Sequence, residues 1–315
     1  MYTKFFGFLE KPFEITPDPR FLYLSDHHKE ALAHLIYAAR EGKGFTVISG
    51  EVGTGKTLMG HTLISRLDGN IKTIYLFNPN LSPLDFLQTL CENLGIKSQE
   101  KSRGQYIAQL HSYLLEVNAR GEKVLLVIDE AQCLSPALLE EIRLLTNLET
   151  DKSKLLLIVL LGQPELNDLL DRHEFRQLKQ RVSLRYHIQT LDKEDIKRYI
   201  EKRLTVAGAQ SLNIFSPRAV KKIFSYSKGT PRLINIICDN ALLTGFATDQ
   251  KIIRTKIVRE VIKRLNGPKR KKEQKVGVPV LVTAMGSLVF GGLFLGWRYG
   301  FLNEVIEIIE RTLFS

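Results

Sequence analysis

A glycine-rich segment in the first third of the chain has the residue types that bind phosphate. It matches the pattern GxxxxGK[ST] with the residues Gly50, Glu51, Val52, Gly53, Thr54, Gly55, Lys56 and Thr57. Glycines let backbone N–H groups turn inward around phosphate oxygens, and a following helix adds the positive end of its dipole. In this pattern the lysine reaches the β- and γ-phosphates and the next hydroxyl binds Mg²⁺. We therefore predict that this segment binds a nucleoside triphosphate with its metal.

Two adjacent acids, Asp129 and Glu130, follow an apolar run from Val124 to Ile128. A buried strand that ends in two acids places the first beside the metal and the second near the attacking water. Two acids after a strand are common by themselves, so this prediction depends on the phosphate loop upstream. With that loop present, we predict Asp129 as a metal ligand together with Thr57, and Glu130 as the group that polarises the water.

The surrounding segments predict the elements that position these residues. The run from Phe45 to Ser49 is apolar and β-branched, which favours a buried strand, and a helical pattern follows the loop. Residues 155–161 predict a second buried strand, and residues 182–188 alternate in the manner of a third. Residues 191–265 lack strand patterns and show helical spacing, which predicts a helical lid on the nucleotide domain.

The C-terminal part of the chain predicts a membrane anchor. Residues 276–297 form a stretch of 22 residues without a charge, and a helix of that length spans about 33 Å, enough for a hydrocarbon core of ~30 Å. The basic segment 269–275 precedes it and is expected to contact anionic lipid on the cytoplasmic side. The alternative is a buried core helix, which is usually shorter. We expect residues 298–315 to form a short extracytoplasmic tail.

Composition narrows the function classes less than the motifs do. The 315 residues include 45 Lys and Arg against 34 Asp and Glu, a formal net charge of +11. A basic balance suits phosphate ligands, anionic lipid or nucleic acid, but no helix-turn-helix or zinc-finger pattern favours nucleic acid. Cys91, Cys133 and Cys238 are far apart and odd in number, which does not favour a disulfide framework. The N-terminus has no signal-peptide core, so we expect it in the cytoplasm.

The motifs resemble those of AAA+ ATPases, and several resemble the ExeA-like family of secretion-pathway A-type ATPases. The resemblance covers residues 1 to about 265 and rests on FFGFLEKPFEITPDPRFLYLS, GEVGTGKT, VLLVIDEAQ, LLGQPEL, FRQLKQR and GTPRLIN. It implies an α/β fold with a P-loop parallel sheet, helices on both faces and a small α-helical lid. It also implies ATP with Mg²⁺ as ligands, and a membrane-tethered cytoplasmic ATPase associated with secretin assembly and envelope or polysaccharide export.

The resemblance also implies roles for residues outside the two main motifs. Gln163 stands at the sensor-1 position, and Arg232 stands at the sensor-2 position in the lid. Arg181 is our first choice, and Arg176 our second, for an arginine finger that reaches the ATP of a neighbouring subunit. These roles imply a homo-oligomer with the nucleotide at the subunit interface, and a partner in the inner membrane or the secretion complex.

We therefore divide the chain into an N-terminal aromatic linker with a first helix, a nucleotide-binding domain, a lid, a basic linker, a membrane span and a tail. The divisions are 1–44, 45–189, 190–266, 267–275, 276–297 and 298–315. Two alternatives stay open, a DNA-associated AAA+ regulator resembling transposition ATPases and an ATP-dependent scaffold with little turnover. We interpret His27 and His28, which precede a helical pattern at 30–40, as surface or capping residues. The aromatic residues near the N-terminus are interpreted as a packed linker, which in this family's fold would lie near the adenine.

Overall fold

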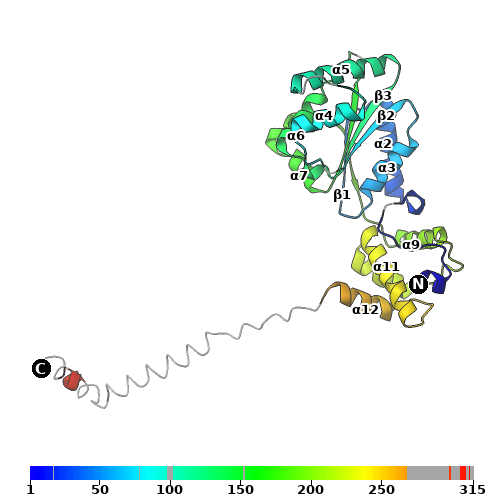
Figure 1. Ribbon diagram of the computed structural model, residues 1–315. Helices are drawn as coiled ribbons and strands as arrows, with labels where there is room; N and C mark the ends of the chain where they lie inside the picture. The colour runs from blue at the N-terminus through cyan, green and yellow to red at the C-terminus, as the bar shows by residue number, and fades with distance from the viewer. Residues whose placement is uncertain are drawn as a thin grey trace. The chain divides into compact units, whose positions relative to one another are not determined.

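The computed structural model divides the chain into two units, Met1–Leu265 and Asn266–Ser315, and we describe each by itself. The described residues are 1–16, 18–77, 79–97, 102–151, 153–267, 298, 306–309 and 312. The first unit contains a sheet domain and a group of helices (Figure 1).

A five-stranded parallel sheet forms the centre of the first unit. Its strands are β1 (Phe45–Gly50), β2 (Ile71–Leu76), β3 (Lys123–Ile128), β4 (Leu156–Gly162) and β5 (Val182–Ile188). Their order is β2-β3-β4-β1-β5, and every pairing is parallel. Three central strands are almost wholly apolar because both of their faces are buried. The carboxyl ends of all five strands therefore meet at one edge, where the loops after β1 and β3 lie.

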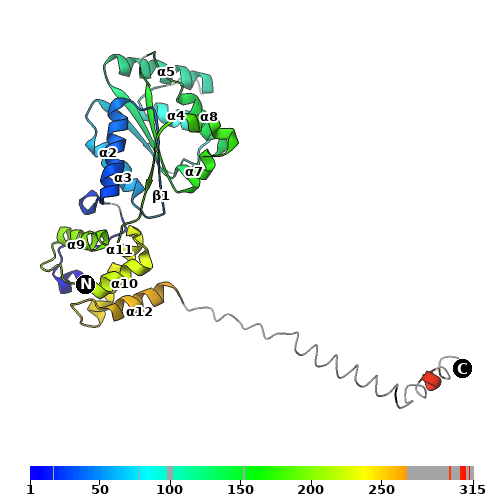
Figure 2. The same ribbon diagram turned by 180° about the vertical axis from the view of Figure 1, so that it is seen from behind.

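Helices cover both faces of this sheet, as Figures 1 and 2 show from opposite sides. Alternate strand residues point to opposite faces, so Ile48 packs with one core and Val47 with the other. The first core includes α2 (Asp26–Glu41) and α3 (Lys56–Arg66). The second core includes α4 (Pro83–Asn93), α5 (Arg103–Ala119), α6 (Pro136–Leu145), α7 (Glu165–Leu170) and α8 (Arg176–Arg181).

The helices after the sheet form a third core with the N-terminal segment. They are α9 (Asp195–Val206), α10 (Pro217–Ser227), α11 (Pro231–Ala247) and α12 (Thr255–Leu265). The short helix α1 (Tyr2–Phe6) packs on α11, and Tyr2, Phe8 and Phe13 are buried in this core. The aromatic residues at the start of the chain therefore complete the core of the lid. Three short 3₁₀ helices, η1 (Pro19–Phe21), η2 (Ala131–Cys133) and η3 (His173–Phe175), lie in the connections.

The predicted parallel α/β sheet with helices on both faces is confirmed, with strands at all four predicted positions. The edge strand β2 was not predicted, because Lys72 and Thr73 are exposed and interrupt its apolar pattern. The first long helix begins at Asp26 rather than Glu30, since the Ser25 hydroxyl accepts from the backbone N–H of His28 and caps it.

No helix among the described residues is both long and apolar enough to cross a membrane. The predicted span, residues 276–297, lies outside the described residues, as do residues 268–275 of the predicted basic linker.

Candidate active site

The phosphate-binding segment connects β1 directly to α3 at the carboxyl edge of the sheet. Gly53 and Gly55 adopt left-handed backbone conformations with φ of 80° and 100°, which side chains disfavour. Helix α3 begins at Lys56, and its N-cap residue, Gly55, has no side chain to satisfy the first N–H groups. The start of α3 therefore presents backbone donors and the positive end of the helix dipole to an anion.

The Lys56 amine lies inside this loop. Its Nζ donates to the backbone carbonyl oxygens of Gly50, at 2.8 Å, and Glu51, at 3.1 Å. Burial lowers the pKa of Lys56 below its usual value, although the nearby carboxylates of Glu130 and Asp129 act in the opposite direction. The site thus holds a partly dehydrated amine beside two acids, and such an amine gains from contact with anionic oxygens.

Asp129 is fully buried at the end of β3 and organises the neighbouring groups. Its Oδ2 accepts hydrogen bonds from the hydroxyls of Thr57, at 2.6 Å, and Tyr75, at 2.7 Å. Its Oδ1 accepts from the backbone N–H of Glu130 at 2.8 Å. Burial, together with the adjacent Asp129, raises the pKa of the Tyr75 phenol, so Tyr75 stays a donor. The structure therefore brings Thr57 and Asp129 together and adds Tyr75, which the sequence analysis missed.

These oxygen ligands fit Mg²⁺. Magnesium prefers hard oxygen ligands and keeps several waters, so one or two protein groups and the substrate phosphates suffice. The hydroxyl of Thr57 and the carboxylate of Asp129 are in direct contact at the foot of the phosphate loop. Within the part of the chain that the structure describes, no group of three or more His, Cys, Asp or Glu residues gathers as a metal cage. The donor set is that of a metal held jointly with a bound triphosphate.

Glu130 lies next to Gln163, which follows the end of β4. The Oε2 of Glu130 accepts hydrogen bonds from the Nε2 of Gln132, at 2.6 Å, and from the Nε2 of Gln163, at 3.4 Å. Gln132 also accepts at its Oε1 from the backbone N–H of Gln163 at 2.9 Å. The structure therefore brings Glu130 and Gln163, two separately predicted site residues, together and places Gln132, which the sequence analysis did not single out, between them. Its polar side chain two residues after the acid was the available signal.

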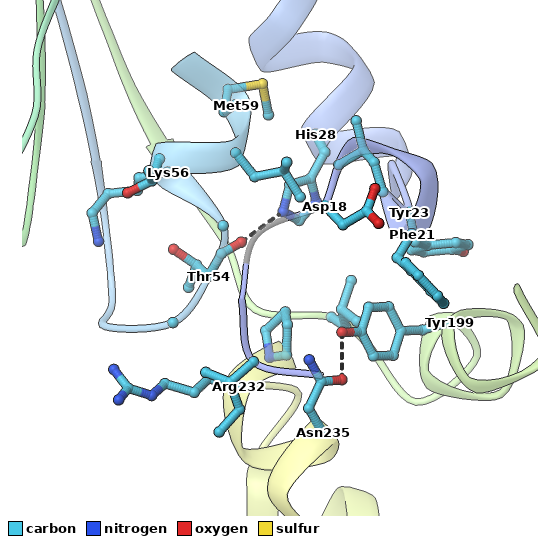
Figure 3. A pocket seen from close by; sticks show the side chains of 18 of the residues that line it. Asp18, Phe21, Tyr23, His28, Thr54, Lys56, Met59, Tyr199, Arg232 and Asn235 are labelled. Carbon is cyan, nitrogen blue, oxygen red and sulfur yellow. Dashed lines mark hydrogen bonds between the residues drawn. The ribbon is translucent and has the colours of Figure 1, made fainter. Parts of the chain in front are cut away.

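The lid closes over the phosphate loop through the start of α11. The backbone N–H of Arg232 donates to the carbonyl of Gly53 at 3.4 Å. A cavity of about 320 Å³ lies between the loop, the lid and the N-terminal segment, and Arg232 lies on its wall (Figure 3). Arg232 thus borders the same cavity as Lys56 and Thr57.

The N-terminal segment supplies another wall of this cavity. Phe21 and Tyr23 line it beside Tyr199 and Asn235 of the lid, which are joined by a 2.7 Å hydrogen bond (Figure 3), and the rings of Tyr23 and Tyr199 meet edge to face with centroids 6.0 Å apart. Tyr23 donates to Asp195 at 2.5 Å, which ties this segment to α9. Aromatic rings with a few polar groups beside a phosphate loop suit a nucleobase.

The interpretation of His28 as a surface or capping residue was wrong, whereas His27 is exposed as expected. His28 is buried, and its Nε2 donates to the carbonyl of Thr54 at 3.1 Å while Ser25 contacts its Nδ1 at 2.6 Å. Burial lowers the pKa of His28 below its usual value, so the ring is neutral at pH 7. Helix α2 therefore supports the phosphate loop through this side chain.

Arg181 lies at the edge of the sheet opposite the phosphate loop, and Arg176 begins α8, the helix that leads to it. Arg181 directly precedes Val182, which pairs with Phe45 at the start of β1, whereas the phosphate loop follows the end of β1. A six-residue strand is roughly 17–20 Å long. Arg181 donates from Nη1 to the Thr146 hydroxyl at 2.8 Å. The structure does not bring either arginine to the phosphate loop of its own chain.

A family model described as an AAA domain matches residues 39–170 of this chain. "General secretion pathway protein A" of Aeromonas hydrophila is 40% identical over 306 residues, which cover 96% of this chain and 55% of that protein. This chain contains an AAA domain and is related to that protein. The resemblance inferred from the motifs is thereby confirmed, and the chain spans about half the length of this relative.

Solved structures support the same fold for the chain. The ORC2 protein of Aeropyrum pernix, in its ADPNP-ADP complexes, has a TM-score of 0.61 and 16% identity, and the match covers 82% of this chain and 72% of that chain. The RuvB Holliday junction branch migration motor of Thermotoga maritima has a TM-score of 0.53 and 20% identity, with 77% and 70% covered. At these identities the likeness shows the fold alone.

Proposed function

We propose that the chain is a membrane-anchored cytoplasmic ATPase that couples Mg·ATP hydrolysis to assembly or operation of a cell-envelope export complex. One observation carries the hydrolytic part: the phosphate loop, the Thr57–Asp129 pair and Glu130 lie together at one sheet edge. The relative named for the general secretion pathway supports the export part. The uncharged residues 276–297 support the anchor.

The chain's own groups divide the hydrolytic work among them. The backbone N–H groups of the loop and the Lys56 amine bind the phosphate oxygens, with the amine exchanging its present carbonyl partners for them. Glu130 accepts a hydrogen bond from the attacking water and orients it in line with the γ-phosphate. Gln163 and Arg232 add polar contacts from β4 and the lid. Mg²⁺, held by Thr57 and Asp129, would neutralise charge on the β- and γ-phosphates.

We further propose that the site is completed by an arginine from a neighbouring copy, Arg181 in preference to Arg176. Arg181 is separated from its own phosphate loop by the length of β1, and Arg176 does not line the cavity beside that loop, so we infer that neither acts on the ATP of its own chain. A ring or filament of copies joined head to tail would bring one chain's arginine edge to the next chain's loop.

A mixing experiment tests this arrangement. Lys56→Ala and Arg181→Ala variants of the full-length chain, each inactive alone, should regain about a quarter of the wild-type rate when mixed equally, because one in four random interfaces is intact. The same mixture made with Arg176→Ala decides between the two arginines. Zero recovered activity with both, or a rate per subunit independent of dilution, would reject a finger in trans.

Membrane attachment is tested by fractionation. Because a span of this length buries its side chains in hydrocarbon, detergent should release the full-length protein. Salt at 1 M should not release it, although the Debye length at 1 M is only about one third of that at 0.1 M. Release by salt would leave only the electrostatic contact of segment 269–275 and would reopen the DNA-associated alternative. The scaffold alternative predicts that Glu130→Gln leaves the ATPase rate unchanged.

A further inference from the structure

We propose that Gln132 is the positioning residue of the catalytic carboxylate: it fixes Glu130 so that one oxygen stays available for the attacking water. This inference rests on the proposed hydrolytic function and assigns a role to a residue that the motifs leave unassigned. Gln132 lies in η2, directly after the two acids.

The two ends of the Gln132 amide have different partners on different strands. Its Nε2 donates to Oε2 of Glu130 at 2.6 Å, beyond the end of β3, and its Oε1 accepts from the backbone N–H of Gln163 at 2.9 Å, beyond the end of β4. An amide anchored at its acceptor end to the backbone cannot rotate without losing that bond. The direction of its donor, and therefore the place of the Glu130 carboxylate, is set by the sheet itself.

The bonds to Glu130 fall on one oxygen only. Oε2 accepts from both Gln132 and Gln163, whereas no hydrogen bond to Oε1 occurs within the described part of the chain. A carboxylate held through one oxygen keeps lone pairs on the other, and a water that must be oriented needs such an acceptor at a fixed point.

The backbone around this contact is shaped for it. Glu130 has a φ of 52°, a left-handed conformation that a glutamate rarely adopts and that persists where the surroundings enforce it. Gly162, beside Gln163, leaves the room that the amide fills: a Cβ there would lie 3.2 Å from Oε1 of Gln132 and 2.7 Å from Leu166. Both features are accounted for if the amide bridge between the strands is required.

The test uses Gln132→Glu in the full-length protein, a substitution of equal size that keeps the acceptor toward Gln163, removes the donor toward Glu130 and places a second carboxylate beside it. We expect kcat to fall about tenfold to a hundredfold, the loss that misplacement by about 1 Å causes. The Kd of a fluorescent ATP analogue should stay within about twofold, since Gln132 contributes nothing to phosphate binding. Circular dichroism confirms that the variant is folded.

Gln88→Glu is the matched control. Gln88 donates to Glu92 at 2.7 Å on the exposed side of α4, so the same substitution breaks the same kind of bond outside the site. It should leave both kcat and Kd unchanged.

The same substitution in a protein that already carries Glu130→Gln separates a positioning role from a merely structural one. Because Gln132 acts through Glu130, Gln132→Glu should lower the residual rate of Glu130→Gln by less than about twofold, a non-additive result expected of residues that act as one unit. A wild-type kcat for Gln132→Glu, or an equal loss in both backgrounds, would overturn the inference. Absence of ATPase activity in the wild-type chain would instead overturn the proposed function.

Discussion

Gly229→Ala should disrupt the junction between the sheet domain and the lid. Gly229 precedes α11 and has a φ of 82°. A Cβ at this position would overlap the backbone carbonyl oxygen of Leu191 and lie 2.8 Å from its carbonyl carbon. The two backbones are also hydrogen-bonded, since the N–H of Leu191 donates to the Gly229 carbonyl at 3.0 Å. The obstacle is backbone at both ends, so no side-chain rotation relieves it.

The expected loss of unfolding free energy has two parts, and a control variant separates them. A non-glycine residue in the left-handed conformation costs about 1–2 kcal/mol, and forcing an atom into a packed region costs about 1–3 kcal/mol more. Gly229→Ala should therefore lower the free energy of unfolding by about 2–5 kcal/mol. Gly121 has a φ of 73° with no atom within 4 Å of its Cβ position, so Gly121→Ala should lose only the first part.

The assay is urea unfolding of the two full-length variants, followed by circular dichroism at 222 nm. Because Arg232 lies three residues after Gly229 and contacts the phosphate loop, Gly229→Ala should also weaken binding of a fluorescent ATP analogue, whereas Gly121→Ala should not. Equal losses of stability in the two variants would refute the packing argument. Unchanged nucleotide binding in a destabilised Gly229→Ala would refute the link from this junction to the site.

Three further substitutions test two contacts around the site and one buried ion pair away from it. Burial lowers the pKa of His28 and holds its ring neutral. The free energy of unfolding should therefore be full above pH 6.5 and fall below it by at most about 1.4 kcal/mol per pH unit. His28→Gln should flatten that pH slope in urea midpoints, and an unaltered slope would contradict the assignment. Tyr75→Phe removes one hydroxyl bond to Asp129 and should cost about 1.5–3 kcal/mol in urea unfolding; it should also raise the Mg²⁺ concentration for half-maximal hydrolysis, and unchanged values of both would be inconsistent with our account. Arg103→Ala leaves the buried carboxylate of Glu141 without its partner and should cost about 2–3 kcal/mol with little effect on kcat, whereas a stable variant would show that the pair contributes nothing.

Short-range patterns predicted the sheet and the main motifs, because each depends on residues close in sequence. Apolar runs predicted β1, β3 and β4, whose faces are both buried. The strand β2 lies at the sheet edge, where exposed polar residues such as Lys72 weaken the same signal. The place of Asp129 beside Thr57 followed from the strand–loop arrangement, although its third neighbour, Tyr75, comes from the unpredicted strand.

Long-range contacts escaped prediction because no local pattern encodes them. Arg203 of α9 donates to the backbone carbonyls of Pro12 and Glu14, which fixes the N-terminal segment on the lid. The aromatic composition near the N-terminus predicted packing, and only the family resemblance implied a place near the adenine; Phe21 lines the cavity beside the phosphate loop. The interpretation of His28 was wrong for the same reason, since its partner Thr54 is distant in sequence.

Titration calorimetry of Mg·ATP into the full-length protein tests the central claim most directly. We predict saturable binding by the wild type, and an affinity about tenfold to a hundredfold weaker for Lys56→Ala, which loses charge-assisted hydrogen bonds to phosphate. Lys29→Ala, which removes an exposed lysine of α2 that pairs with Asp26, should bind as the wild type does. No binding heat from folded wild-type protein, or equal affinities for the wild type and Lys56→Ala, would contradict the account.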